Sequence, residues 1–146
     1  MNGIKILNRE ITPEELERMQ RGFDEHTVDN GVEVQTANRY GFTAELDGVF
    51  IGCSSGLAYM NGSRCSGWFY LTDLFVEKPY RRSGLGAQLL TALENDIRKA
   101  GVKHIWTWTA GYEAPGFYLK QGYEIFTEMD NWYSDGSSRV GFRKQL

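Results

Sequence analysis

Apolar residues along the chain follow two spacings, and each spacing predicts a different kind of element. Runs in which apolar residues are continuous or alternate with polar ones predict strands, whereas apolar residues three or four positions apart predict helices. The first pattern predicts strands at residues 4–8, 39–46, 49–60, 68–76, 104–109, 123–129 and 140–144. The second predicts helices from residue 12 onward, at 85–100 and at 114–121, while residues 22–38 fit either a further short helix or a loop.

Short local signals mark where several of these elements begin and end. Thr12 can cap the first helix, Pro13 suits its first turn, and Glu15 completes a capping box. The dipeptides Asp47-Gly48 and Asn61-Gly62 are typical of tight hairpin turns, so the strands on either side of each should pair antiparallel. Strands and helices mixed in this order predict an α/β protein.

The segment from Val76 to Gly86 is the strongest candidate for chemistry. It joins an expected strand to an amphipathic helix and carries Arg81, Arg82, Gly84 and Gly86. The N–H groups in the first turn of a helix have no partner within it, glycine lets a phosphate approach the backbone, and arginine adds positive charge. We therefore expect the loop to bind a pyrophosphate. A solvated arginine pair and glycines that merely begin a helix are the alternatives.

Two common phosphate-binding loops do not fit this segment. A Walker loop needs a Gly-Lys pair, and the sequence contains none. A dinucleotide-binding loop needs a third glycine three positions after Gly86, where Leu89 stands. Binding of a nucleotide such as ATP or NAD is therefore disfavoured.

Composition limits the classes of function. With 146 residues, the chain is expected to form one domain, 1–146. The net charge of −3 and the pI near 5.4 argue against nucleic-acid binding, which needs a basic surface. No apolar run of about 18 residues predicts a membrane span, and the first residues lack the apolar core of a signal peptide. We therefore expect a cytoplasmic protein with no membrane partner.

Metal and disulfide chemistry are not expected. Cys53 and Cys65 should lie far apart along a hairpin ladder, and neither has the spacing of a metal ligand. The two histidines, His26 and His104, are well separated in the sequence. The sequence therefore predicts no metal site.

Two motifs resemble the GNAT superfamily of acyl-CoA-dependent N-acyltransferases. The string Arg81-x-x-Gly84-x-Gly86 after a strand is similar to the coenzyme A loop of that family. Residues 114–123, which read Ala-Pro-Gly-Phe-Tyr-Leu-Lys-Gln-Gly-Tyr, resemble a second family segment. The resemblance implies a twisted, mixed, mostly antiparallel sheet of about seven strands flanked by about four helices, with splayed central strands at 68–76 and 104–109.

The same resemblance implies that acetyl-CoA is the co-substrate. Backbone amides of the loop would face its pyrophosphate, and the main chain at the end of strand 68–76 would pair with the pantetheine arm and supply the oxyanion donor. Relatives often carry asparagine at the end of the next strand, where this chain has Thr109, which offers fewer hydrogen-bonding groups. The implied cofactor-binding residues are Phe75, Val76, Arg81, Arg82, Ser83, Gly84, Leu85, Gly86, Ala87 and Thr109.

Two residues are candidates for catalysis. Tyr118 matches a tyrosine that the family uses to protonate the leaving thiolate, and a phenol with a usual pKa of about 10 keeps its proton at neutral pH. A packed aromatic ring is the alternative. Relatives often carry a glutamate base where this chain has Thr72, so Asp73 is the candidate base or amine anchor, provided that a bulge turns it to the site. A buried structural carboxylate is the alternative for Asp73, and Glu113 or water could act as the base instead.

These features predict an N-acetyltransferase that moves acetyl from acetyl-CoA to a primary amine by direct attack in a ternary complex. Four carboxylates and no Lys or Arg lie within residues 24–33, which would attract a small cationic acceptor or simply form a solvated face. A protein lysine or N-terminus is the alternative acceptor, and a non-catalytic acyl-CoA sensor is the alternative function. Trp132 and Tyr133 would line the acceptor pocket or a homodimer contact.

Overall fold

The computed structural model describes residues 3–146, and these divide into two compact units, Met1–Val34 and Gln35–Leu146. We call them the N-terminal unit and the sheet unit and describe each by itself. The N-terminal unit contains helix α1 (Pro13–Asp29). The sheet unit contains, in order, β1 (Gln35–Leu46), β2 (Val49–Asn61), β3 (Arg64–Val76), a short 3₁₀ turn (Lys78–Tyr80), α2 (Leu85–Lys99), β4 (His104–Ala110), α3 (Pro115–Lys120), β5 (Glu124–Met129) and β6 (Arg139–Gln145).

Helix α1 begins as its sequence predicts. The Thr12 side chain accepts from the Glu15 backbone N–H at 3.2 Å, and the Glu15 carboxylate accepts from the Thr12 N–H at 3.0 Å. This capping box satisfies two of the N–H groups that a helix leaves without partners. The helix continues to Asp29, so residues 22–38 hold the end of α1, a turn and the start of β1 rather than a second helix.

The strand expected at residues 4–8 is wrong: these residues form no strand. Alternating apolar residues can mark a strand only where a neighbouring backbone supplies hydrogen bonds, and the described part of the N-terminal unit contains no other strand. Over residues 3–146 the fold therefore has six strands and three α-helices, not the expected seven and four.

The six strands form one mixed sheet in the order β1-β2-β3-β4-β6-β5. All neighbours pair antiparallel except β3 and β4, which are parallel. The β2–β3 hairpin turns through Gly62 and Ser63, because Asn61 pairs with Arg64. Gly62 has the positive φ of 61° that such a turn requires. The turn therefore lies one residue later than the expected Asn61-Gly62 turn.

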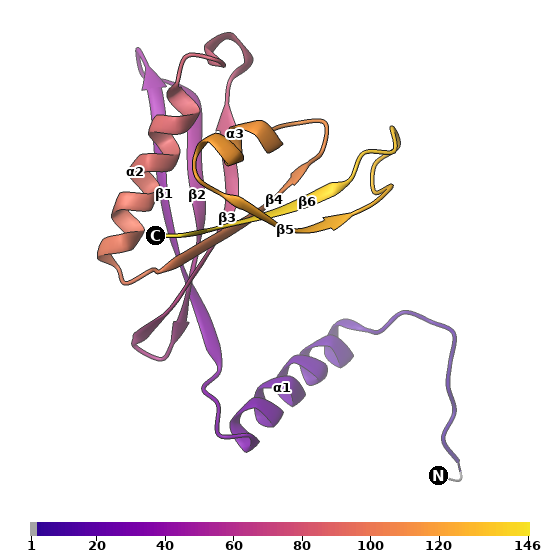
Figure 1. Ribbon diagram of the computed structural model, residues 1–146. Helices are drawn as coiled ribbons and strands as arrows, with labels where there is room; N and C mark the ends of the chain where they lie inside the picture. Colours follow the sequence, from indigo (N-terminus) through magenta and orange to yellow (C-terminus); the bar gives the residue numbers. More distant parts are fainter. Residues whose placement is uncertain (1–2) are drawn as a thin grey trace. The chain divides into compact units, whose positions relative to one another are not determined.

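Helices α2 and α3 both pack on one face of the sheet, which Figure 1 shows with the helices in front. Leucine and isoleucine side chains at a helical spacing on α2 meet apolar side chains from the central strands. The core residues exposed by less than 2% and largest in volume are Phe69, Phe142, Leu71, Leu90, Leu93, Ile97, Ile105 and Val102. This core holds α2 and α3 close to the two central strands.

The parallel pairing of β3 and β4 is short, and the two strands then separate. Only three residue pairs connect them, from Trp68 with His104 to Tyr70 with Trp106. The Thr107 hydroxyl then donates to the Leu71 carbonyl oxygen at 2.9 Å, just beyond the last pair. We call the space between the diverging strands the fork. Each arm keeps its outer partner, since β2 pairs with β3 as far as Val76 and β6 pairs with β4 through Ala110.

Two glycines let β2 approach its neighbours closely, and Gly56 is the more constrained. A Cβ atom there would lie 2.2 Å from the Tyr70 carbonyl oxygen and 2.4 Å from the Phe69 ring. These distances are far below van der Waals contact, so an alanine would push the strands apart next to the fork. Gly116 in α3 provides a contrast, because a Cβ there would meet nothing within 4 Å.

We predict that Gly56→Ala lowers the free energy of unfolding by about 3 kcal/mol, the upper end of the cost of overpacking a core. Gly116→Ala should leave stability unchanged or raise it by about 0.5–1 kcal/mol, because alanine is the better helix former. Urea unfolding followed by tryptophan fluorescence measures both. Equal stabilities for the two variants would contradict the close contact at Gly56.

Candidate functional site

The loop after β3 exposes backbone N–H groups at the start of α2. Arg82 and Gly84 both have positive φ, 61° and 84°, and Gly84 is the residue just before the helix. The first bond of the helix runs from the Gln88 N–H to the Gly84 carbonyl oxygen at 3.0 Å. The N–H groups of residues 85–87 therefore have no partner within the helix and are available to an anion.

Two side chains fix the shape of this loop. The Arg81 Nε donates to the Val76 carbonyl oxygen at 2.9 Å, and the Ser83 hydroxyl donates to the Tyr80 carbonyl oxygen at 2.5 Å. Arg81 therefore ties the loop to the end of β3. A Cβ on Gly86 would lie 3.6 Å from the Phe117 ring and 3.8 Å from the Val76 side chain. The loop thus adjoins both β3 and α3.

The fork leaves one edge of β3 without a strand partner. From Asp73 to Val76 the pairing is to β2 alone, and β4 has diverged. Phe75 is 39% exposed on this part of β3, and Thr109 stands on the opposite arm with its side chain buried. A linear ligand that carries amide groups could pair with this free edge as an added strand does. Coenzyme A has such an arm joined to a pyrophosphate, so loop and fork together fit it.

Tyr118 lies beneath the fork in the core between α3 and the sheet. Its ring stacks on Phe142 with centroids 5.3 Å apart, and only 6% of the residue is exposed. Burial raises the pKa of the Tyr118 hydroxyl to about 12, with Thr107 acting in the opposite sense and the Glu113 carboxylate adding to the rise. Tyr118 therefore keeps its proton at neutral pH. Its neighbour Thr107 is the residue that bridges the two arms.

Asp73 is turned away from the core by a bulge in β3. Ser55 pairs with Asp73 and Gly56 with Leu71, so Thr72 is the extra residue. The bulge that the sequence argument required is therefore present. Asp73 is exposed rather than a buried structural carboxylate. The pKa of the nearby Cys53 thiol is raised, first because the thiol is partly buried and second because of the negative charge of Asp73.

A buried ionic group supports the core beside Tyr118. Glu94 of α2 is 5% exposed, and its carboxylate accepts from the Lys144 ammonium at 3.0 Å and from the Tyr123 hydroxyl at 2.9 Å. Burial, followed by the Glu94 charge, raises the pKa of Tyr123 well above its usual value. Tyr123 in turn packs edge-on against Tyr118, with ring centroids 5.5 Å apart. This group links α2, β6 and the end of α3.

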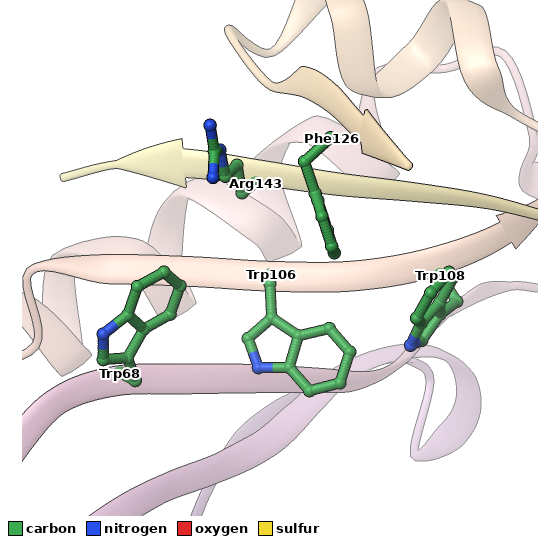
Figure 2. Close-up of a pocket in the computed structure, with 5 residues that line it drawn as sticks. All are labelled: Trp68, Trp106, Trp108, Phe126 and Arg143. Atoms are coloured by element: carbon green, nitrogen blue, oxygen red, sulfur yellow. The ribbon is translucent and has the colours of Figure 1, made fainter. Parts of the chain in front are cut away.

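Aromatic side chains cover the opposite face of the sheet. Trp106 stands between Tyr70, which stacks on it at 4.2 Å, and Trp108, which meets it edge-on at 6.0 Å. A hollow of about 290 Å³ lies on this face. Figure 2 shows the side chains that line it, Trp68, Trp106, Trp108, Phe126 and Arg143. Trp68 and Trp106 belong to the paired part of β3 and β4, so the hollow lies toward the closed end of the fork and not at the phosphate loop.

Three polar residues of this region are not predicted by the sequence patterns. Thr107 and Glu94 were hidden within apolar patterns, although a polar residue on a buried face is itself a signal that a partner exists. Arg39 gave no local signal, because its partners Ser55 and Thr72 lie on two other strands. Glu113, the other candidate base, lies in the turn before α3 and is exposed.

Within residues 3–146, no group of three His, Cys, Asp or Glu side chains gathers as a metal site. Over the same residues, none of the helices combines the length and apolar character that spanning a bilayer demands. Cys53 and Cys65 are both free thiols.

Comparison with known proteins gives a family match over most of the chain. A model of the acetyltransferase (GNAT) family matches residues 5–123. An L-ornithine N5-acetyltransferase from Arabidopsis thaliana is 39% identical over 64 residues, which cover 41% of this chain and 27% of that protein. The chain thus spans well under two thirds of this relative.

Solved structures share the fold at low sequence identity. An acetyltransferase from Bacillus cereus superposes with a TM-score of 0.80 at 21% identity, over 97% of this chain and 98% of the other. An aminoglycoside 6'-N-acetyltransferase complexed with coenzyme A gives a TM-score of 0.61 at 20% identity, over 73% of this chain and 72% of the other.

We predict that Gly84→Ala weakens coenzyme A binding while Gly86→Ala does not. Gly84 has a φ of 84°, which costs an alanine about 1–2 kcal/mol and would tilt the first turn of α2. A Cβ on Gly86 makes only ordinary contacts, the shortest at 3.6 Å. Calorimetric titration with coenzyme A should show about a tenfold loss for Gly84→Ala. Full affinity for Gly84→Ala would argue against the loop as the binding site.

We predict that Tyr118 makes folding sensitive to alkaline pH. Its folded pKa of about 12 exceeds its usual value of about 10, so its stabilising effect is complete below about pH 10 and is lost as pH rises through 12. Between about pH 9 and about pH 11, wild type should lose about 1 kcal/mol more stability than Tyr118→Phe. Urea unfolding at both pH values measures this, with exposed Tyr112→Phe as the control for loss of a phenol. Parallel losses in wild type and Tyr118→Phe would contradict the prediction.

Proposed function

The chain belongs to the acetyltransferase (GNAT) family, and from this premise we propose that it transfers acetyl from acetyl-CoA to the primary amine of a small cationic acceptor. The observation that carries the proposal is the fork between β3 and β4, with a phosphate-binding loop at the end of one arm and Tyr118 beneath it. The transfer would be a direct attack in a ternary complex.

The loop before α2 and the free edge of β3 bind different parts of acetyl-CoA. The N–H groups of residues 85–87 bind the pyrophosphate, and Arg81 and Ser83 hold the loop that presents them. The free edge of β3 at Phe75 and Val76 binds the pantetheine arm, with Thr109 on the facing arm. Acetyl-CoA supplies an acyl thioester whose carbonyl carbon accepts the amine.

The residues around the fork then stabilise the leaving sulfur and remove a proton from the acceptor ammonium. As the amine nitrogen bonds to the carbonyl carbon, the carbon–sulfur bond breaks and the sulfur leaves as a thiolate. Tyr118 donates a hydrogen bond to that sulfur, since its pKa of about 12 keeps the phenol protonated. Asp73 binds the acceptor ammonium and takes its first proton, directly or through water. The second proton, which the nitrogen loses as the amide forms, passes through solvent to the sulfur. A backbone N–H near Val76 stabilises the oxyanion.

The surroundings of Asp73 support a cationic acceptor. Asp73 is exposed, and the bulge places it on the same face as Tyr70 and Phe75. A carboxylate flanked by aromatic rings attracts an ammonium group by charge and by cation–π contact. The partial match to an ornithine acetyltransferase supports an amino-acid-like amine, which leads the list of acceptors to test.

The experiment is acetyl-CoA-dependent release of coenzyme A thiol across an amine panel of ornithine and related amino acids, polyamines, aminoglycosides and lysine peptides. We expect transfer to a small diamine. Tyr118→Phe should lower kcat about 100-fold, the scale expected when one hydrogen-bond donor to a developing negative charge is removed, while the coenzyme A affinity stays unchanged. Leu119→Ala, a change at an exposed neighbour on the same helix, is the matched control and should keep full activity.

The outcomes separate the alternatives. Transfer to peptides alone would assign a protein lysine or N-terminus as the acceptor. Coenzyme A binding without transfer to any amine would favour an acyl-CoA sensor. The observation that supports this alternative is the Thr72 hydroxyl at the position where relatives often carry a glutamate base. Failure to bind coenzyme A would overturn the proposed function.

A further inference from the structure

The bulge in β3 is held by side chains from three strands. Arg39 of β1 reaches across β2, where one of its guanidinium nitrogens donates to the Ser55 hydroxyl at 2.9 Å and to the Thr72 hydroxyl at 3.1 Å. The Thr72 hydroxyl lies 2.7 Å from the Asp73 carboxylate and 3.1 Å from the Ser55 carbonyl oxygen. Thr72, the extra residue of the bulge, therefore lies in the middle of a hydrogen-bond network that runs from Arg39 to Asp73.

The chemistry of the three side chains determines which group donates each hydrogen bond in this network. A guanidinium only donates, and an ionised carboxylate only accepts. Thr72 has one hydroxyl proton, and its oxygen already accepts from Arg39, so that proton is free for the Asp73 carboxylate, its nearest acceptor. Hydrogen bonds to a charged group are shorter and stronger than neutral ones, which matches the 2.7 Å contact.

The network has features of a positioning device rather than of a fold-stabilising contact. Arg39 is exposed on an edge strand. Ordering such a long side chain costs conformational entropy, and a hydrogen bond to a neutral hydroxyl contributes little stability to offset it. Its partners are nevertheless the bulge hydroxyl and a serine directly opposite Asp73 in the ladder. The carboxylate would otherwise rotate freely on the exposed face.

We propose that Arg39 is a positioning residue that acts through the Thr72 hydroxyl to orient the Asp73 carboxylate toward the acceptor amine. This inference rests on the proposed function, because it needs Asp73 to meet the amine. It explains why a threonine can occupy the bulge position: its hydroxyl passes the orientation imposed by Arg39 to the next residue. One oxygen of Asp73 is held by Thr72, which leaves the other for the acceptor.

The test is a double-mutant cycle between Arg39→Met and Asp73→Asn, measured as kcat/KM for the best amine. Arg39→Met should lower kcat/KM for the amine about tenfold in the wild-type background and less than about twofold in the Asp73→Asn background, because the effects of residues in one hydrogen-bond network are not additive. The KM for acetyl-CoA should stay unchanged. Arg98→Met, which removes an exposed arginine of α2 whose guanidinium donates to Asn95, is the matched control and should keep wild-type kcat/KM.

Two further variants test the route through the hydroxyl. Thr72→Ser keeps the hydroxyl and should keep most of the activity, whereas Thr72→Val keeps the shape and should match Arg39→Met. Equal losses from Arg39→Met in both backgrounds, or full activity of Thr72→Val, would overturn the inference while leaving the acetyltransferase intact. Absence of transfer by the wild type to every amine would instead remove the proposed function, and the inference with it. Thermal unfolding of each variant confirms that the fold is retained.

Discussion

The early separation of two parallel strands is the constraint on which the rest of the site depends. Parallel pairing between β3 and β4 stops after three residue pairs, and buried backbone groups without partners are costly. The fold limits this cost because β2 continues to pair with β3 and β6 with β4, so each arm gives up hydrogen bonds on one side only. The open edges therefore face a gap that water or a ligand must fill.

The position of the fork is set by side chains in the core. The Thr107 hydroxyl bonded to the Leu71 carbonyl oxygen satisfies the first backbone group past the last pair. Tyr118 fills the space beneath, and its own neighbour Tyr123 is held by the buried Glu94–Lys144 pair. A buried ion pair of this kind is weak evidence for stability, since desolvation offsets its attraction. Its effect here is to fix the geometry of three elements around Tyr118.

Local signals in the sequence predicted the parts of the fold that depend on neighbouring residues. The loop at 81–87, helix α2 and the capping box of α1 all follow from spacing and residue type within one or two turns. The strand at 4–8 was wrong because a strand depends on a distant partner, which no local pattern reports. The Arg39 network could not be predicted for the same reason: a bulge at Thr72 and a register across β1, β2 and β3 bring it together.

In the proposed reaction, the acidity of Tyr118 would decide how the leaving group is handled. A phenol with a pKa of about 12 is a much weaker acid than a thiol, whose usual pKa is about 8.5, so full proton transfer to a thiolate is uphill in the free protein. A hydrogen bond from the same hydroxyl, however, strengthens as negative charge develops on the sulfur. The burial that makes Tyr118 a poor acid also removes competing water from that bond. In the proposed reaction its contribution would therefore be stabilisation of the departing charge, with solvent completing the protonation once the thiolate leaves the fork.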